Sequence, residues 1–191
     1  MKNWRLEEKD QVKFYRIKPL PGLNLVFTTR IKGWSKGNYH SLNLSYDVGD
    51  DQRFVDRNYR RVKKALGVTK IFTLKQVHSN KVFYVTSGNF KEALEGDGLF
   101  TDEKGLAIGV KVADCLPVYI FDKKYKIIGI AHAGWRSILA QIGKNLVNAL
   151  TGKFGLSPSD LNFVLGPCID QTCYEAGFEL LSKFFNNLPG S

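Results

Sequence analysis

Three side chains of the types that bind metals or act as nucleophiles follow β-rich stretches of the chain. His78 and His132 each come directly after such a stretch, and Cys115 lies between two others. Because the ends of strands often deliver functional side chains into a crevice, we expect one pocket to receive all three. A thiolate and two neutral imidazoles suit zinc, and three protein ligands leave the fourth tetrahedral position open for water, as in catalytic zinc sites.

The spacing of these residues leaves other interpretations open. The gaps of 37 and 17 residues between them match no local metal motif such as CxxC. By composition alone, Cys115 is more typical of a small buried hydrophobic residue, and either histidine of a hydrogen-bonded residue at a strand end. A third interpretation is a metal-free pair in which His132 activates Cys115 as a thiolate nucleophile, with Asp114 or another carboxylate orienting the imidazole. Metal content distinguishes the metal site from the metal-free pair.

The remaining histidine and cysteines give weaker signals. His40 lies in the glycine-containing loop 32–41 with no strand before it, so we expect a solvated or substrate-side residue rather than a ligand. Cys168 and Cys173 are five residues apart in GPCIDQTCYEAG and offer only two ligands, which favours packing in a turn and helix over a metal site.

The residues after His132 could hold an anion. Ala133 and Gly134 allow a tight exit before Trp135, and a helix is expected to begin near Arg136. The free N–H groups and the positive dipole end of a helix favour an anion there, and an arginine adds a forked phosphate contact. A tryptophan at position 135 is equally typical of a surface on which a ligand base stacks and of a side chain packed into the core.

Alternating and helical patterns predict one mixed α/β domain over residues 1–191, without a repeat or linker. Seven strands are expected at 23–29, 71–77, 81–86, 106–112, 117–121, 126–131 and 162–165. Three helices are expected: from Asp50 or Asp51 to Leu66, from Arg136 to Leu150, and from Glu175 to Asn186. The predicted buried faces consist of Phe54, Tyr59, Val62 and Leu66 in the first helix, Ile138, Ile142, Leu146 and Leu150 in the second, and Phe178, Leu181, Phe184 and Phe185 in the third.

The composition is that of a globular domain. The 191 residues are 43% hydrophobic and 24% charged. No apolar run reaches the length of a signal-peptide core or of a membrane span, so a cytoplasmic location without membrane contact is expected. Three cysteines form no disulfide framework, and their odd number leaves at least one thiol free.

The net charge of +10 suggests either a polyanionic partner or solubility. The densest basic stretch, RNYRRVKK at 57–64, lies in the first predicted helix, where its charges surround Tyr59 and Val62. Since a charge run alone specifies no groove or base contact, we favour a solvated helix face over nucleic-acid binding.

Seven motifs together resemble one family. They are TTR at 28–30, SLNL at 41–44, QVH at 76–78, EGDGLFTD at 95–102, VADCLPVYIFD at 112–122, AHAGWRS at 131–137 and GPCIDQTCYE at 166–175. In this order they look like the laccase-domain or polyphenol-oxidase family, described as multifunctional purine nucleoside phosphorylases and adenosine deaminases. The resemblance implies that His78, Cys115 and His132 are catalytic zinc ligands, with copper as the alternative metal. It also implies an α/β/β/α sandwich with mixed sheets, similar to certain bacterial toxin deamidases.

The chemistry implied by the resemblance has two parts. One is phosphorolysis of adenosine, inosine and methylthioadenosine to base and ribose 1-phosphate, and the other is hydrolytic deamination of adenosine. Arg30, Arg136 and Asn43 match family positions and are the candidates for substrate and phosphate binding, with Lys111 a weaker one. Three acidic residues match family positions: Asp97, Asp114 and Glu175. Each could relay protons, cap a turn or orient a histidine. Purine nucleosides and phosphate are the expected partners, with a homo-oligomer as an open option.

Two departures from the family pattern bear on activity. Lys32-Gly33 stands where the family usually has two glycines, so the substrate loop is expected to differ. Family members also continue into a segment with a CT motif, whereas this sequence ends at Leu188-Pro-Gly-Ser, so we expect the domain to lack that segment. The competing functions are a copper-dependent phenol oxidase, a Cys–His amide hydrolase and a non-catalytic nucleotide-binding module.

Overall fold

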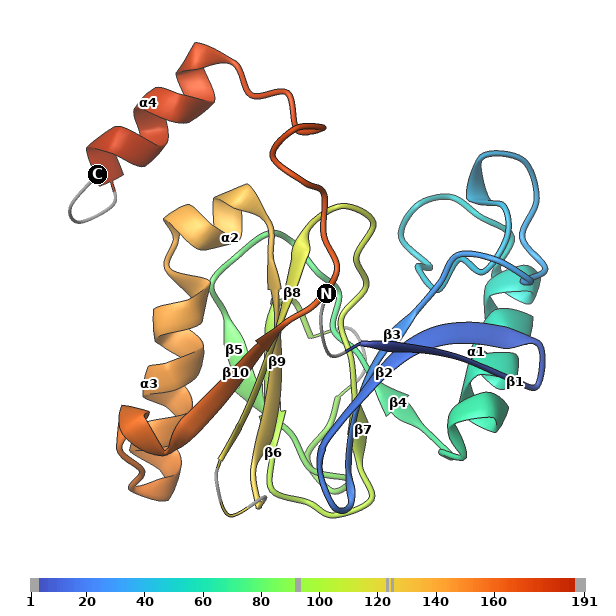
Figure 1. Ribbon diagram of the computed structural model, residues 1–191, viewed down its shortest axis with the longest axis horizontal. Helices are drawn as coiled ribbons and strands as arrows, with labels where there is room; N and C mark the ends of the chain where they lie inside the picture. The colour runs from blue at the N-terminus through green and yellow to red at the C-terminus, as the bar shows by residue number, and fades with distance from the viewer. Residues whose placement is uncertain (1–3, 92–93, 123, 125, 188–191) are drawn as a thin grey trace. The chain divides into compact units, whose positions relative to one another are not determined.

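The computed structural model describes residues 4–91, 94–122, 124 and 126–187. The chain divides into two compact units (Figure 1), the first formed by Met1–Phe72 and Lys104–Ala107 and the second by Thr73–Glu103 and Ile108–Ser191. Each unit is described by itself.

The first unit is a three-stranded antiparallel sheet with one helix. The sheet has the order β1 (Arg5–Lys9), β2 (Val12–Leu20), β3 (Leu23–Thr28), and α1 (Gln52–Leu66) packs beside β2 (Figure 1). Val12 and Phe14 of β2 are buried together with Val62 and Ala65 of α1. The burial of these apolar side chains is the main force that holds the helix on the sheet.

The ends of α1 are those that its capping residues predict. The Asp51 carboxylate accepts the backbone N–H of Arg53, and Gly67 closes the helix in the left-handed region at φ 71°. The predicted buried face is only partly correct: Val62 is buried and Leu66 packs against the core, but the other buried residues of the helix are Val55, Asn58 and Ala65.

A buried asparagine accounts for the rotated face of α1. Asn58 is 0% exposed, and its amide N–H groups donate to the hydroxyl of Ser35 and to the carbonyls of Ser41 and Asn43. Its side-chain oxygen accepts the backbone N–H of Trp34. A pattern of apolar spacing cannot predict a buried polar residue whose hydrogen bonds join a loop to a helix.

The second unit contains a five-stranded mixed sheet with the order β10-β8-β9-β6-β5. The strands are β5 (Val82–Tyr84), β6 (Gly98–Thr101), β8 (Leu116–Asp122), β9 (Ile128–Ala133) and β10 (Leu161–Leu165). Only β5 and β6 pair in parallel. One face is covered by α3 (Ile142–Phe154), whose Ile142, Leu146 and Leu150 are buried in one cluster with Ile120 and Ala131 (Figure 1).

The single helix expected from Arg136 to Leu150 is in fact two helices. α2 (Trp135–Leu139) and α3 are separated at Gln141, which has a left-handed φ of 62°. The predicted apolar stripe holds within α3, but Ile138 of α2 is 36% exposed. Apolar spacing continued across the break, so the pattern could not locate it.

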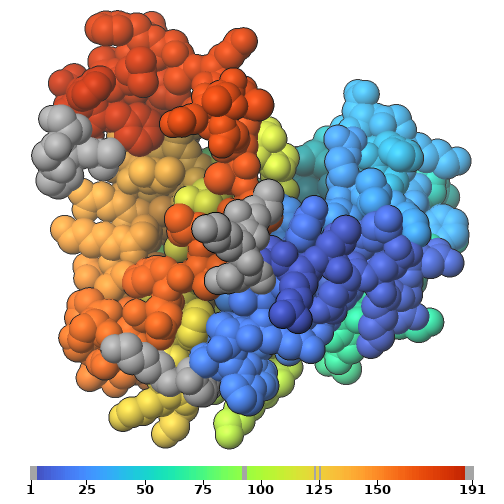
Figure 2. All heavy atoms as spheres, in the orientation of Figure 1, coloured from blue at the N-terminus to red at the C-terminus, as the bar shows by residue number. Residues whose placement is uncertain are grey.

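The last helix, α4 (Phe178–Asn187), begins three residues later than expected and has no buried residue. The prediction that Phe178, Leu181, Phe184 and Phe185 face a core is wrong, since Phe178 is 84% and Phe185 is 66% exposed. Figure 2 shows α4 at the surface of the second unit. An amphipathic period reveals an apolar face but not what covers it.

The other strand predictions differ mainly in length. β4 (Ile71–Phe72) and β7 (Ala107–Ile108), which form a two-stranded sheet, are much shorter than predicted. β1, β2 and β6 were not predicted, because their charged and glycine residues obscure the alternation. The expected mixed α/β class with mixed sheets is confirmed. Among the described residues, no helix combines the length and apolarity that crossing a bilayer requires.

Candidate metal centre

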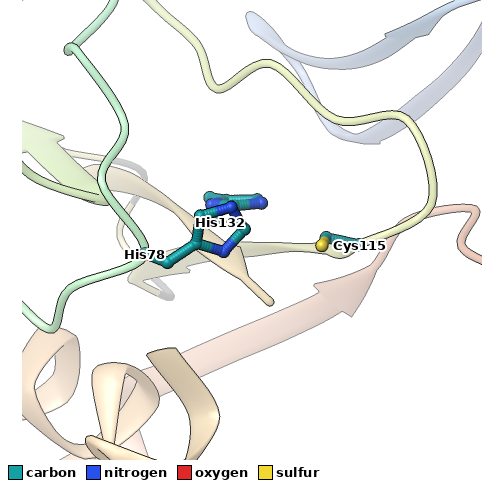
Figure 3. A group of neighbouring side chains, drawn as sticks. All are labelled: His78, Cys115 and His132. Atoms are coloured by element: carbon teal, nitrogen blue, oxygen red, sulfur yellow. The ribbon is translucent and has the colours of Figure 1, made fainter. Parts of the chain in front are cut away.

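Three potential ligands meet in the second unit. The ligand atoms of His78, Cys115 and His132 all lie within 4.8 Å of one another. Figure 3 shows the Cys115 sulfur directed toward the two imidazole rings, whose centroids are 4.8 Å apart. The structure therefore brings together three residues that are widely separated in the sequence.

Sheet register explains how two of the ligands meet. β8 and β9 are antiparallel, with Pro117 opposite His132 and Leu116 opposite Ala133. Cys115, immediately before β8, therefore lies at the same end of the strand pair as His132. His78 comes from the loop between β4 and β5 and has a left-handed φ of 56°.

One buried carboxylate supports both histidines. Asp97 is 0% exposed, and its Oδ1 lies 2.8 Å from Nδ1 of His132 and accepts the backbone N–H of His78 at 3.1 Å. Its Oδ2 accepts the backbone N–H and the hydroxyl of Ser79 at 2.6 and 2.9 Å. Because Nδ1 of His132 faces a carboxylate, the neutral form of the ring carries its proton on that nitrogen, and Nε2 then offers a lone pair to a metal.

The ionisation states suit metal binding. Burial tends to raise the pKa of Asp97, but hydrogen bonds from His132 and Ser79 outweigh it and hold the pKa below its usual value. Partial burial, together with the nearby His132 and Arg136, lowers the pKa of His78, so its imidazole is neutral at neutral pH. A neutral imidazole is the form that binds a metal.

Cys115 is a thiol unless a cation is present. Burial, followed by the charges of Asp114 and Asp97, raises the pKa of its thiol. Among the described hydrogen bonds, none joins Cys115 to either histidine. A metal ion would reverse this balance, because a coordinated thiol loses its proton.

Gly134 gives the cluster its space. A Cβ atom at this position would lie 2.7 Å from Nδ1 of His78 and 3.1 Å from Sγ of Cys115. Glycine was expected here for a tight exit from the strand, and the structure adds that any side chain would enter the cluster.

These features fit a tetrahedral metal ion. Ligand bonds of about 2.0–2.3 Å place tetrahedral ligand atoms roughly 3.3–3.7 Å apart. The observed limit of 4.8 Å thus requires a contraction of about 1.5 Å at most. The donor set of two imidazole nitrogens and one sulfur, the carboxylate behind His132 and the side-chain-free position 134 all agree with such an ion.

Arg136 lies close enough to this cluster to influence it. It belongs to the first turn of α2 and is exposed, with its guanidinium carbon 4.1 Å from the centroid of the Trp135 ring. Its charge contributes to the lowered pKa of His78. Trp135 also lies under Lys183 of α4, whose Nζ is 5.6 Å from the ring centroid.

Arg30 and Asn43 belong to the first unit, where the side chain of each forms hydrogen bonds within a loop. The Arg30 guanidinium donates two hydrogen bonds to the carbonyl of His40, at 3.1 and 2.6 Å. The Asn43 amide donates to Asp50, and its side-chain oxygen accepts the backbone N–H of Ser45. These contacts explain the two residues structurally without a ligand.

The remaining candidates lie outside the ligand cluster. Gln76 bonds both the N–H and the carbonyl of Lys111, and the carbonyl of Asp114 accepts the N–H of Ile169. Glu175 is exposed. Cys168 and Cys173 are exposed free thiols. Sequence reasoning missed Ser79, whose adjacency to His78 was its only signal.

Comparison with known proteins places this chain in a family. The family model described as multi-copper polyphenol oxidoreductase laccase matches residues 24–191. The chain belongs to that laccase family. Among curated relatives, the purine nucleoside phosphorylase of Staphylococcus saprophyticus is 34% identical over 93% of this chain and 70% of its own length. Purine nucleoside phosphorylase YlmD of Geobacillus stearothermophilus is 34% identical over 90% of this chain and 66% of its own.

Solved structures of this laccase family share the fold. The crystal structure of YlmD from Geobacillus stearothermophilus has a TM-score of 0.88 at 30% identity, covering 97% of this chain and 73% of that one. Bacillus licheniformis protein YfiH also gives a TM-score of 0.88 at 30% identity, over 96% of this chain and 71% of that one. The chain thus spans roughly 70% of these relatives.

Proposed function

We propose that the protein is a zinc-dependent purine nucleoside phosphorylase that also deaminates adenosine. The observation that carries the proposal is the His78–Cys115–His132 cluster, supported by Asp97, in a chain whose relatives are named purine nucleoside phosphorylases. Adenosine, inosine and methylthioadenosine are the proposed nucleosides, and phosphate is the co-substrate.

The proposed roles follow from the contacts. His78, Cys115 and Nε2 of His132 would hold the ion, which when bound supplies a Lewis acid that activates water or polarises a substrate atom. Asp97 keeps His132 in the correct tautomer and orientation. The exposed Arg136 would attract phosphate, since its field already reaches His78. Arg30 and Asn43 are proposed as further substrate contacts on the family resemblance.

Zinc is proposed over copper because of the number of ligands. One blue-copper centre uses two histidines and a cysteine, and this chain has three histidines in all. Such a centre would use the whole cluster and leave only His40 for a second copper. A multi-copper oxidase mechanism therefore has too few ligands in this chain.

The metal-free amide hydrolase is disfavoured by the state of Cys115. A Cys–His nucleophile requires a thiolate stabilised by an imidazolium, whereas the pKa of the Cys115 thiol is raised and that of His78 is lowered. Both shifts favour neutral groups over an ion pair.

Metal content provides the first test. Purified protein loaded with zinc and desalted should retain close to one zinc per chain by elemental analysis, and Cys115→Ser should lose most of it. Cys168→Ser is the matched control, since Cys168 is an exposed thiol outside the cluster. Equal zinc content in both variants would contradict the proposed site, and copper retained in place of zinc would overturn the choice of metal.

Product analysis provides the second test. Zinc-loaded protein with adenosine and phosphate should give adenine and ribose 1-phosphate, and without phosphate it should give inosine alone. Cys115→Ser should abolish both reactions, phosphorolysis and deamination, and Cys168→Ser should abolish neither. A fully zinc-loaded protein that forms no product from any of the three nucleosides would rule out catalysis and favour a binding module.

A further inference from the structure

The positive charge of the chain is confined to one unit. The first unit contains 17 lysines and arginines and 7 acidic residues, whereas the second contains 11 of each. The first unit therefore accounts for the entire net charge of +10. Charge needed only for solubility would not have to be concentrated in this way.

Within the first unit, the solvent-facing side of α1 carries a regular basic stripe. Arg53, Arg57, Arg60 and Lys64 follow one another at intervals of four, three and four residues, and all are exposed. At 1.5 Å per residue the stripe is about 16 Å long. The buried residues of α1 lie on the opposite side of the helix.

The centre of the stripe is not neutralised. Its two ends are paired, Arg53 with Asp51 at 2.6 Å and Lys64 with Asp10 at 3.0 Å. None of the ion pairs among the described residues uses Arg57 or Arg60. Lys63, beside them, is also absent from those pairs.

Exposed aromatic rings border the stripe on both flanks. On one flank Trp34 is 38% exposed, and the guanidinium carbons of Arg57 and Arg61 lie 3.4 and 4.9 Å from its ring centroid. On the other flank Tyr46 is 44% exposed and stacks on Tyr59, with ring centroids 5.6 Å apart and an interplanar angle of 5°.

The sequence favours a solvated face here, but the central charges outside the described ion pairs and the flanking rings add what the charge run lacked, and we propose that this face of α1 binds single-stranded nucleic acid. A single phosphate ion would engage one or two cations, whereas a strand with repeated phosphates matches cations spaced by about 4.5–6 Å along a helix. Exposed aromatic rings next to a basic track are the usual platform for unpaired bases. An acidic peptide would use the charges but not the rings. The proposal is independent of the proposed enzyme function.

Fluorescence anisotropy with a labelled 20-nucleotide oligouridylate provides the test. Binding at low salt should weaken with NaCl with a logarithmic slope of about −2 to −3, as expected for three or four phosphate contacts. Arg57→Glu/Arg60→Glu should weaken binding by about tenfold or more. Lys126→Glu/Lys144→Glu, which makes the same charge change at exposed positions of the second unit, should bind as the unmodified protein does.

A second variant and two competition experiments complete the test. Arg60→Gln/Lys63→Gln removes charge without disturbing the Arg57–Trp34 contact, so weaker binding with unchanged thermal unfolding supports the surface even if the reversal variant unfolds. The absence of binding at low salt, or equal weakening by the second-unit control, would overturn the proposal. Competition by polyglutamate as effective as by unlabelled oligouridylate would also overturn it, in favour of an acidic protein partner. Competition by inorganic phosphate at matched ionic strength would also overturn the proposal, in favour of a site for single phosphate ions.

Discussion

At the scale of single residues, Asp97 holds the two histidines of the candidate metal centre in place. Its carboxylate accepts hydrogen bonds from the ring of one histidine ligand and from the backbone of the other. Its own carbonyl also accepts the backbone N–H of His132 at 2.7 Å. One buried group thus aligns a strand with a loop, which reduces the reorganisation needed to bind an ion.

Replacing Asp97 by asparagine should therefore weaken metal binding. Asn at this position keeps one acceptor oxygen but replaces the other with an NH₂ donor and removes the charge that orients His132, and we expect a loss of about 10- to 100-fold in zinc affinity. Competition against a chromophoric chelator measures this loss. Asp102→Asn is the control, since Asp102 accepts only from the exposed Tyr84 hydroxyl among the described hydrogen bonds. Equal affinities of the two variants would show that Asp97 has no role at the metal.

A second prediction at this scale concerns the space that Gly134 leaves beside the ligand cluster. Gly134→Ala places a methyl group 2.7 Å from Nδ1 of His78, so it should impair zinc retention while the fold persists. Gly143→Ala is the matched control: no atom lies within 4 Å of the new Cβ. Because alanine is favoured within a helix, Gly143→Ala should raise the free energy of unfolding by about 0.5–1 kcal/mol. Zinc analysis and urea unfolding read out both effects, and full zinc retention by Gly134→Ala would contradict the close approach.

At the scale of elements, local chemistry was more predictable than packing. Both ends of α1 were predictable, with a start at Asp50 or Asp51 and an end at Leu66, because caps act on neighbouring backbone groups. The buried face of that helix depends on Asn58 and the loop it binds, which no local pattern reveals. The positions of the three candidate ligands after β-rich stretches led us to expect one pocket, and Cys115 and His132 do lie at strand ends, whereas His78 lies in a loop. The Asp97–His132 contact could not be predicted in this way, because it joins residues 35 positions apart and depends on the pairing of β6 with β9.

The break between α2 and α3 carries a prediction about stability. Gln141 adopts φ 62°, a left-handed conformation that costs a residue with a Cβ about 1 kcal/mol relative to glycine. Gln141→Gly should therefore raise the free energy of unfolding by roughly 0.5–1 kcal/mol, measured by urea denaturation. Gln52→Gly, in the first turn of α1, should lower it by a similar amount. Destabilisation by Gln141→Gly would mean that its side chain supports the break.

At the scale of the whole molecule, the two units differ in chemistry. The first carries the whole net charge, and the second carries His78, Cys115 and His132, the cluster that could hold a metal. Composition alone reveals the total charge but not its partition, because the boundary between the units depends on contacts between distant segments.

This division predicts where zinc stabilises the chain. An ion that binds only the folded state adds about 2.7 kcal/mol when its free concentration is 100 times the dissociation constant. Since all three ligands lie in the second unit, removing zinc with a chelator should speed amide hydrogen exchange in β8, β9 and the loop around His78. Exchange in α1 of the first unit, followed by mass spectrometry in the same sample, serves as the internal reference. Cys115→Ser should show the faster pattern with or without zinc. An equal change in α1 would mean that the ion stabilises both units as one cooperative structure.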